Sequence, residues 1–587
     1  MSPSRAFLLS GGRVPDPRSV RAGDLVLDAG NTATLPSGVR VVSARDLLPF
    51  AEAEAIQIAC LRFVARWHSG SEDLRPLPCS PGRVVESLAL IDLGQALKHL
   101  VLLRRFACRE GVRAIVADLD LPWLRAVAPV LADDPAPVDL VAPGGSGLLL
   151  RRAALGVRLV LGRGRSRDRH PGASVEARPE RTGRLRVWGL ANYRNRAILD
   201  TLSTAPGFSL RCFERAYENR YLPPSGAREE APYRAAARSL APPRERVEQA
   251  AHEAWPEIPG AHDVAFDVLL RSMRLLVPAA CREAAGWGRL LAEDPPDVIL
   301  SGIPWGGDLR TLALVALKER IPLLACQDGV LAEVGAGGVP VGAGALAWGP
   351  AGRAWFTRRG FPDDAVFEVG DPYLERLVSG LDREDGKALR RRLGIPPAER
   401  VILASVQNSA PHFLACDPAD PVRWVRILLD AFSSIAGTCL VLKPHPRLPL
   451  VDGGRRLAHL REMAKGLAWA RIVEPDEPIV GLMALSDAHV GEGDTLSLEM
   501  LACGKPAILL ERQGLPSFYP DFASSGAMTV VRSARALAER LAAGLPPANP
   551  GARRTLLDRH LQSAVSPGQA LLAIAGRAPS PDRARVR

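Results

Sequence analysis

A regular alternation of short apolar runs and amphipathic stretches is the feature of this chain that most constrains its fold. Pro296–Leu300 has the length and composition of a buried strand, Asp308–Arg320 has helical spacing, and Ile321–Ala325 is a second strand. A strand, a helix and a strand in this order form the crossover unit of a parallel sheet. Because the alternation continues to about residue 543, the sequence predicts an α/β fold of doubly wound parallel sheets.

The length of 587 residues is sufficient for three or four domains of ordinary size. We expect two tandem Rossmann-like sheets that face a cleft, preceded by a further α/β region. The predicted divisions are an N-terminal α/β region, a basic linker or loop, a first and a second Rossmann-like domain, and C-terminal helices with a disordered tail, at 1–150, 151–184, 185–345, 346–545 and 546–587.

Composition narrows the class of protein. Apolar residues make up 47% and charged residues 24%, which is ordinary for a globular chain. We find no apolar run of about 18 residues, the length that crosses a bilayer, and no apolar stretch within residues 1–20 that is typical of a signal peptide. The expected location is therefore the cytosol. The nine cysteines are scattered, so neither a disulfide framework nor a metal site is expected.

The positive charge is concentrated in one segment. The net charge is +11, and residues 151–187 hold eleven arginines against three acidic residues. We interpret this segment as a solvated linker, with the alternative of a basic arm that contacts anionic lipid at the inner face of the membrane. Nucleic acid is a poor candidate partner, because aromatic residues are 5% of the chain and do not alternate with basic ones.

Ligands of open parallel sheets bind beyond the carboxyl ends of the strands, and the stretch from Gly491 to Glu499 follows one strand and opens a helix. Gly491 and Gly493 allow close approach of the backbone, and the helix start with Thr495 and Ser497 favours a phosphate. Glu499 lies one turn further on, where its carboxylate could accept two ribose hydroxyls. The alternative interpretation is that Asp494 only caps the helix and that Glu499 faces solvent.

Two further strand ends have residues suited to chemistry. His445 lies between two prolines directly after an apolar strand, where it could hold a phosphate leaving group, and Lys443 could add positive charge. Asp328 ends the crossover strand of the first sheet and could deprotonate an acceptor hydroxyl across the cleft. The alternatives are a histidine bound by nearby backbone groups and an aspartate that belongs to an Asp-Gly turn.

The order of these motifs resembles bacterial glycosyltransferases of the GT-B fold. More narrowly, it is similar to the surface-carbohydrate biosynthesis group that includes sialyltransferases, Kdo (3-deoxy-octulosonate) transferases and glycerophosphate polymerases. The resemblance covers about residues 296–531 and rests on Gln327-Asp328-Gly329, Trp348-Gly349, Val369-Gly370-Asp371-Pro372, Lys443-Pro444-His445-Pro446, Thr495 to Glu499 and Gly504-Lys505-Pro506.

The resemblance implies roles for three residues: Asp328 as the general base, His445 as the phosphate contact or acid, and Thr495 as the hydroxyl that holds the nucleotide. The chain departs from the sialyltransferase pattern at Gln327, where an acidic residue is expected, and at Asp494, where a hydroxyl is expected. The implied function is transfer of a sugar, with a nonulosonate as one candidate, from a nucleotide sugar to a glycan or lipid-linked acceptor of O-antigen or capsule assembly. Neither metal nor cofactor is expected.

Two other functions remain open. A sugar-nucleotide epimerase would need additional acid and base groups near the donor, for which Glu492, Asp494 and Glu511 are candidates. A non-catalytic scaffold of a polysaccharide assembly complex would bind through the basic segment and residues 1–150. Nucleotide-sugar binding distinguishes the scaffold from the two enzymes.

Overall fold

The computed structural model describes most of the chain, in several stretches separated by gaps. The described residues are 6–10, 20–29, 37–68, 81–117, 119, 122–141, 183–214, 221–222, 227–331, 341–381, 386–406, 420–446, 448, 454–511, 520–545 and 549–576. The predicted linker at 151–184, its proposed contact with anionic lipid and the tail from Pro579 therefore lie outside the described residues, apart from residues 183 and 184.

Every recorded strand pairing is parallel, and the strands form three sheets, so the predicted α/β class of doubly wound parallel sheets is confirmed. The first sheet has the order β3-β2-β1-β4-β5. Its strands and the helices among them are β1 (Ala6–Ser10), β2 (Leu25–Ala29), β3 (Arg40–Ser43), α1 (Ala44–Leu47), α2 (Phe50–Arg66), α3 (Pro81–Glu110), β4 (Ala114–Val116), α4 (Pro122–Ala132) and β5 (Asp139–Val141).

The second sheet has the order β11-β10-β9-β8-β6-β7. The fully buried β8 lies inside it, as expected of an apolar strand covered by helices on both faces. Its elements are β6 (Leu185–Leu190), α6 (Arg196–Thr204), β7 (Phe208–Phe213), α7 (Ala227–Ser239), α8 (Arg244–Ala254), α9 (Ala261–Glu293), β8 (Val298–Gly302), α10 (Gly307–Lys318), β9 (Leu323–Cys326), β10 (Gly344–Ala347), α11 (Pro350–Arg358), a 3₁₀ helix (Asp363–Ala365) and β11 (Val366–Glu368).

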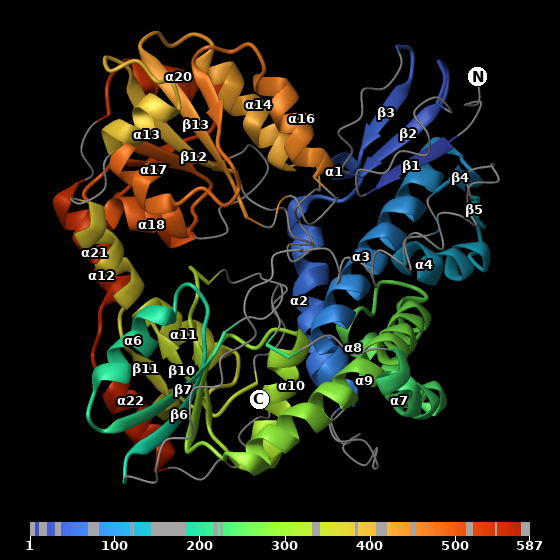
Figure 1. The fold of residues 1–587 in the computed structure, drawn as a ribbon. Helices are drawn as coiled ribbons and strands as arrows, with labels where there is room; N and C mark the ends of the chain where they lie inside the picture. The colour runs from blue at the N-terminus through green and yellow to red at the C-terminus, as the bar shows by residue number, and fades with distance from the viewer. Residues whose placement is uncertain are drawn as a thin grey trace.

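The third sheet has the order β14-β13-β12-β15-β16-β17. Figure 1 shows it above the second sheet, with the first sheet to the right. Its elements are α12 (Pro372–Leu381), α13 (Gly386–Arg392), β12 (Arg400–Val406), α14 (Asp420–Phe432), β13 (Thr438–Pro444), α16 (Arg455–Ala464), β14 (Ala470–Ile472), α17 (Ile479–Leu485), β15 (Ala488–Gly491), α18 (Thr495–Ala502), β16 (Ala507–Leu510), α19 (Pro520–Ser524), β17 (Thr529–Val531) and α20 (Ala534–Ala542).

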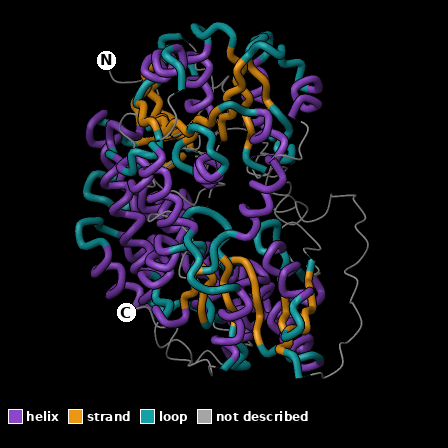
Figure 2. The backbone as a smooth tube through the Cα atoms, turned by 90° about the vertical axis from the view of Figure 1, so that its left-hand side faces the viewer, coloured by secondary structure: helices purple, strands orange, loops and turns teal. Residues whose placement is uncertain are grey.

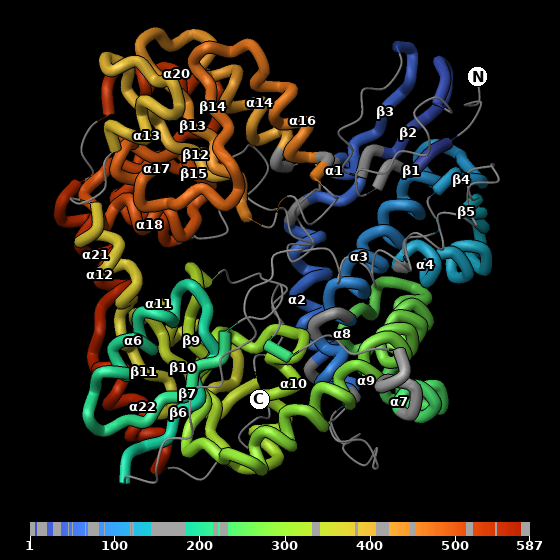
Figure 3. Tube along the Cα trace, viewed as in Figure 1, coloured from blue at the N-terminus to red at the C-terminus, as the bar shows by residue number. Residues whose placement is uncertain are grey.

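Two groups of helices pack away from their neighbours in sequence. Helices α7, α8 and α9 lie between β7 and β8 along the chain, yet they contribute to the core of the N-terminal region, where α9 packs on α3. After the third sheet, α21 (Pro550–Leu561) contacts α11 and α18, and α22 (Pro567–Ala575) packs on β8 and β10. Figure 2 shows the helices around the three groups of strands, and Figure 3 shows the red C-terminal trace beside the second sheet.

The pairing of β10 and β11 places the end of the second sheet later in the chain than the predicted domain boundary. The division between residues 345 and 346 falls inside β10, which pairs with β9 on one side and with β11 on the other. Both strands are therefore part of the second sheet, and the chain passes to the third sheet after β11. Within the described residues, no helix is long and apolar enough to cross a membrane.

Candidate functional site

The turn that follows β9 presents Asp328. Gln327 is buried and fixes this turn, because its Nε2 donates to the carbonyl of Gly329 (2.9 Å) and its Oε1 accepts from the amide of Trp348 (2.9 Å). A Cβ at Gly352 would lie 2.2 Å from Gln327 Oε1, so only glycine leaves room for that amide. Gln327, which departs from the family pattern, therefore has a structural role, and Asp328 beside it is half-buried.

Three strand ends converge next to Asp328. Gly302 ends β8, and the position that a Cβ would take there lies 2.7 Å from Asn192 Nδ2 and 4.0 Å from Asp328 Oδ2. Asn192 belongs to the loop after β6, so the ends of β6, β8 and β9 lie together. Tyr193 in the same loop is 64% exposed. The Asp328 carboxylate disfavours ionisation of its phenol and so raises the pKa of that group.

The start of α18 is capped by Asp494. Its carboxylate accepts from the amide and the hydroxyl of Ser497 (2.8 and 2.9 Å), and the Ser497 hydroxyl faces the Asp494 amide in a capping box. Ser497 is thus turned into the protein with 1% of its surface exposed. The capping role that the sequence left open for Asp494 is the one the structure shows.

A buried histidine lies beneath this cap. His489 has its two ring nitrogens 3.3 Å from the hydroxyls of Ser405 and Ser497, and Ser405 also donates to Asp494. Burial lowers the pKa of His489, and the Asp494 carboxylate opposes this shift. Burial disfavours ionisation of Asp494, but His489 and the hydrogen bonds from both serines outweigh it and hold its pKa below the usual value. Gly491 passes against the imidazole, and Gly493 has a φ of 83° that glycine adopts readily.

Thr495 joins the second and third sheets. Its Oγ1 accepts a hydrogen bond from the amide of Val330 (3.0 Å), and Gly329 packs against the same oxygen. Asp328 is the residue before Gly329, so the predicted base and the predicted phosphate-binding helix start lie at one junction. The structure therefore brings Asp328 and Thr495 together from positions 167 apart in the sequence.

Glu499 forms an ion pair that the sequence did not predict. Arg194, in the loop after β6, donates from Nη2 to Glu499 Oε1 and from Nη1 to Asp371 Oδ2 (2.6 Å). The three side chains are between 3% and 6% exposed. Arg194 lies in the loop that follows the apolar strand β6, so the rule that ligands bind at carboxyl ends of strands could have singled it out.

Lys443 and His445 lie at the end of β13, which is separated from β15 by β12. The Lys443 ammonium is buried and donates to the carbonyls of Pro444 (3.2 Å) and Pro475, and burial lowers its pKa. His445 is half-buried, and its amide donates to Val406 (2.9 Å). The observed contacts of Lys443 are thus with backbone groups, and His445 lies at the end of β13, with β12 between this strand and β15.

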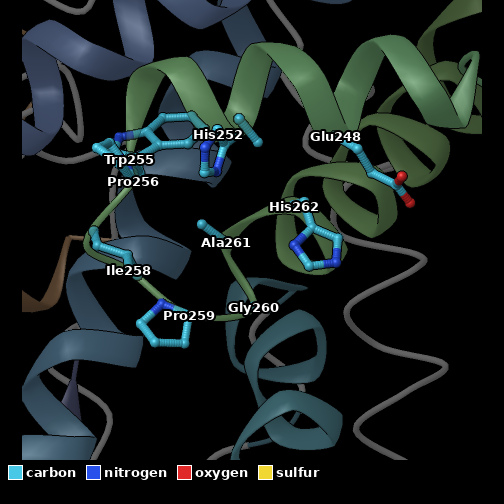
Figure 4. A pocket seen from close by; sticks show the side chains of 10 residues that line it. Glu248, His252, Trp255, Pro256, Ile258, Pro259, Gly260, Ala261 and His262 are labelled. Carbon is cyan, nitrogen blue, oxygen red and sulfur yellow. The ribbon is translucent and has the colours of Figure 1, made fainter.

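A cavity of about 320 Å³ lies at the corner between α8 and α9, away from these residues. Figure 4 shows His252 and Trp255 from the end of α8 on one side and His262 from α9 on the other. Among the described residues, no group of three or more His, Cys, Asp or Glu side chains is placed to hold a metal ion.

Solved structures similar to this chain include two epimerases and a polymerase. UDP-GlcNAc 2-epimerase from Neisseria meningitidis bound to UDP-GlcNAc has a TM-score of 0.40 and 14% identity over 67% of this chain and 98% of its own. A putative UDP-N-acetylglucosamine 2-epimerase from Listeria monocytogenes gives 0.41 and 13% over 66% and 94%. A variant of the wall teichoic acid polymerase TagF gives 0.37 and 12% over 67% and 88%. No protein-family model matches the sequence, and no curated protein matches it.

Proposed function

We propose that the chain binds a nucleotide sugar between the second and third sheets and transfers its sugar to a hydroxyl of a glycan or lipid-linked acceptor. The hydrogen bond between Val330 and Thr495 carries this proposal, because it holds the Asp328 turn against the start of α18. A carboxylate that can accept a proton thus lies next to a helix start that can bind a phosphate, as sugar transfer requires.

The helix start retains donors for a phosphate. Among the described residues, the amides of Thr495 and Leu496 donate to no other group, and they point along the positive end of the helix dipole. The Asp494 carboxylate would repel a phosphate, but it is already bound by Ser405 and Ser497. The Thr495 hydroxyl accepts from Val330 and still has its own proton to donate.

The sugar end of the site is at the Asp328 side. In the proposed reaction, Asp328 accepts the proton of the acceptor hydroxyl, the acceptor oxygen forms a bond to the anomeric carbon, and the bond from that carbon to the phosphate oxygen breaks. Developing charge on the leaving phosphate is stabilised by the α18 amides, with His445 as the proposed second contact. Tyr193 is the exposed aromatic group beside Asp328, and its ring offers an apolar face to a sugar.

Calorimetric titration with CMP, UDP, CDP and GDP and with their sugar conjugates tests the binding step. We expect one nucleotide to bind, and Thr495→Val to weaken that binding about tenfold, the value of one charge-assisted hydrogen bond. Thr555→Val is the matched control, because Thr555 is exposed on α21 and its hydroxyl donates only to its own helix. A chain that binds none of these compounds acts as a scaffold and contradicts the proposal.

Turnover is tested separately from binding. Asp328→Asn should retain nucleotide-sugar affinity and lose transfer by at least about 100-fold, the scale of a general base. Asp430→Asn on the exposed side of α14 serves as the control. His445→Ala should also lower turnover without loss of folding. Conversion of the sugar without any acceptor would identify an epimerase instead.

A further inference from the structure

Arg194 is held in a closed environment of opposite charge and aromatic rings. Its guanidinium bridges Asp371 and Glu499 and is 5% exposed. The ring centroids of Tyr373 and Trp348 lie 4.6 and 4.9 Å from its central carbon. These contacts compensate the loss of hydration of a buried cation. Such an arrangement fixes both the position and the orientation of the guanidinium.

The bridge is anchored in two different parts of the molecule. The Arg194 amide donates to Asn192 Oδ1 (2.9 Å), so its backbone is tied to the end of β6 in the second sheet. Asp371 precedes α12 and Glu499 lies on α18 of the third sheet. The orientation of Glu499 is therefore set by the loop that also presents Tyr193 beside Asp328.

The contact with Glu499 is one-sided. Arg194 binds Oε1, and within the described part of the chain Oε2 accepts no hydrogen bond. A carboxylate held by one oxygen presents the other in a fixed direction.

We propose that Arg194 is a positioning residue that holds Oε1 of Glu499 and so directs its Oε2 at a ribose hydroxyl of the ligand. This inference rests on the proposed function, because it places the nucleotide beside α18. Without the guanidinium, the pKa of Glu499 would rise further and Oε2 would lose its fixed direction. Recognition of the ribose would then depend on pH.

The groups that face Glu499 give the direction of that dependence. Burial raises its pKa, Arg194 lowers it, and Asp371 and Asp494 raise it. Tyr193, Tyr373 and Cys503 also interact with its charge. Because Arg194 is the cation in this group, its removal raises the pKa of Glu499 further. The ionised form, which accepts hydroxyl donors best, is then regained only at higher pH.

The first test compares each nucleotide of the panel with its 2′-deoxy form between about pH 5.5 and 8.5. The unaltered chain should prefer the ribonucleotide about tenfold at neutral pH. Arg194→Met should lose this preference at neutral pH and regain only part of it as pH rises, because the direction of Oε2 is no longer fixed, and Arg194→Lys should restore it at neutral pH. Arg353→Met, in an exposed pair with Asp363, is the control. An equal loss of affinity for both nucleotides in Arg194→Met would overturn the proposal.

The second test needs no ligand, so it separates this inference from the proposed function. When folding raises the pKa of a carboxyl, the folded state binds more protons than the unfolded state. The protein therefore loses stability as pH rises through that raised pKa. Unfolding of Arg194→Met should therefore become easier from about pH 5 to 8, and adding Glu499→Gln should reduce that slope to the part that Asp371 carries. An unchanged slope contradicts the inference. A reduced slope without nucleotide binding contradicts only the proposed function.

Discussion

At the start of α18, the space available to each side chain limits which residues fit, in addition to their chemical role. Gly491 ends β15 directly above the buried imidazole of His489, and the two glycines before Asp494 allow the chain to turn into the helix. The helix start is the part of the site that the proposed phosphate would contact. Its geometry therefore depends on residues that never touch the ligand.

Gly491→Ala should destabilise the fold. The added Cβ would lie 2.5 Å from His489 Cε1 and 2.9 Å from Ser497 Oγ, so the buried cluster must shift. We expect a loss of about 1–3 kcal/mol in the free energy of unfolding, measured by chemical denaturation. Gly288→Ala in α9 meets no atom within 4 Å and should be neutral or stabilising by up to about 1 kcal/mol. Equal effects of the two changes would contradict this account.

At the scale of elements, α9 is the main connection between the N-terminal region and the second sheet. One of its faces completes the core that α2, α3 and α4 form, and α10 packs against another. Leu269 lies in that core with no exposed surface, whereas Leu275 on the same helix is 63% exposed. The two leucines therefore allow a direct comparison of a buried and an exposed leucine on the same helix.

Leu269→Ala should cost about 2–5 kcal/mol in unfolding free energy, because it leaves a cavity in a close-packed core. Leu275→Ala should change it by less than about 0.5 kcal/mol. Denaturation followed by circular dichroism measures both. Comparable losses would mean that the α9 packing described above is not the one that stabilises the protein.

The sequence predicted most strands, at the edges as well as inside the sheets, but missed β1 at the centre of the first sheet and β7 at the edge of the second. β8, β12 and β13 are continuous apolar runs, so their positions follow from composition. β7 alternates apolar and polar residues at the edge of its sheet and was missed. The packing of α9 on the N-terminal region could not be predicted either, because no local pattern records which core a helical face covers.

The candidate site was also predicted only in part. The turn at Asp328 and the helix start at Thr495 follow strands, so their place at the junction was predictable. The role of Arg194 was not, because its partners lie 177 and 305 positions further along the chain. A lone arginine after a strand gives no signal for such partners. The assignments of His445 and Lys443 to the donor remain predictions.

At the scale of the whole molecule, a buried ion pair links the N-terminal region to the second sheet. Arg310 on α10 donates to Glu86 on α3 and to the carbonyl of Arg83 (2.6 Å), and His68 Nε2 lies 2.5 Å from Glu86. Burial raises the pKa of Glu86, but Arg310 and His68 outweigh it and hold the pKa below the usual value. The pair therefore stabilises the fold at neutral pH and loses this effect as pH falls through that lowered pKa.

Glu86→Gln should cost about 3–5 kcal/mol in unfolding free energy at neutral pH, because Arg310 then stays buried without its counterion. Asp363→Asn removes one partner of the exposed pair with Arg353 and should leave the unfolding free energy nearly unchanged. Urea denaturation at pH 7 measures both. If the two losses were equal, the link between the regions would not depend on this buried pair.

The return of α22 to the second sheet affects how the protein can be made. Ala570, Leu571 and Ile574 fill the same core as residues of β6 and β8, although the whole third sheet is encoded between them. On the ribosome, the third sheet can be completed while the second still lacks one of its covering helices. Folding from the first-made to the last-made residue therefore cannot proceed sheet by sheet, and the second sheet must wait with an uncovered apolar face.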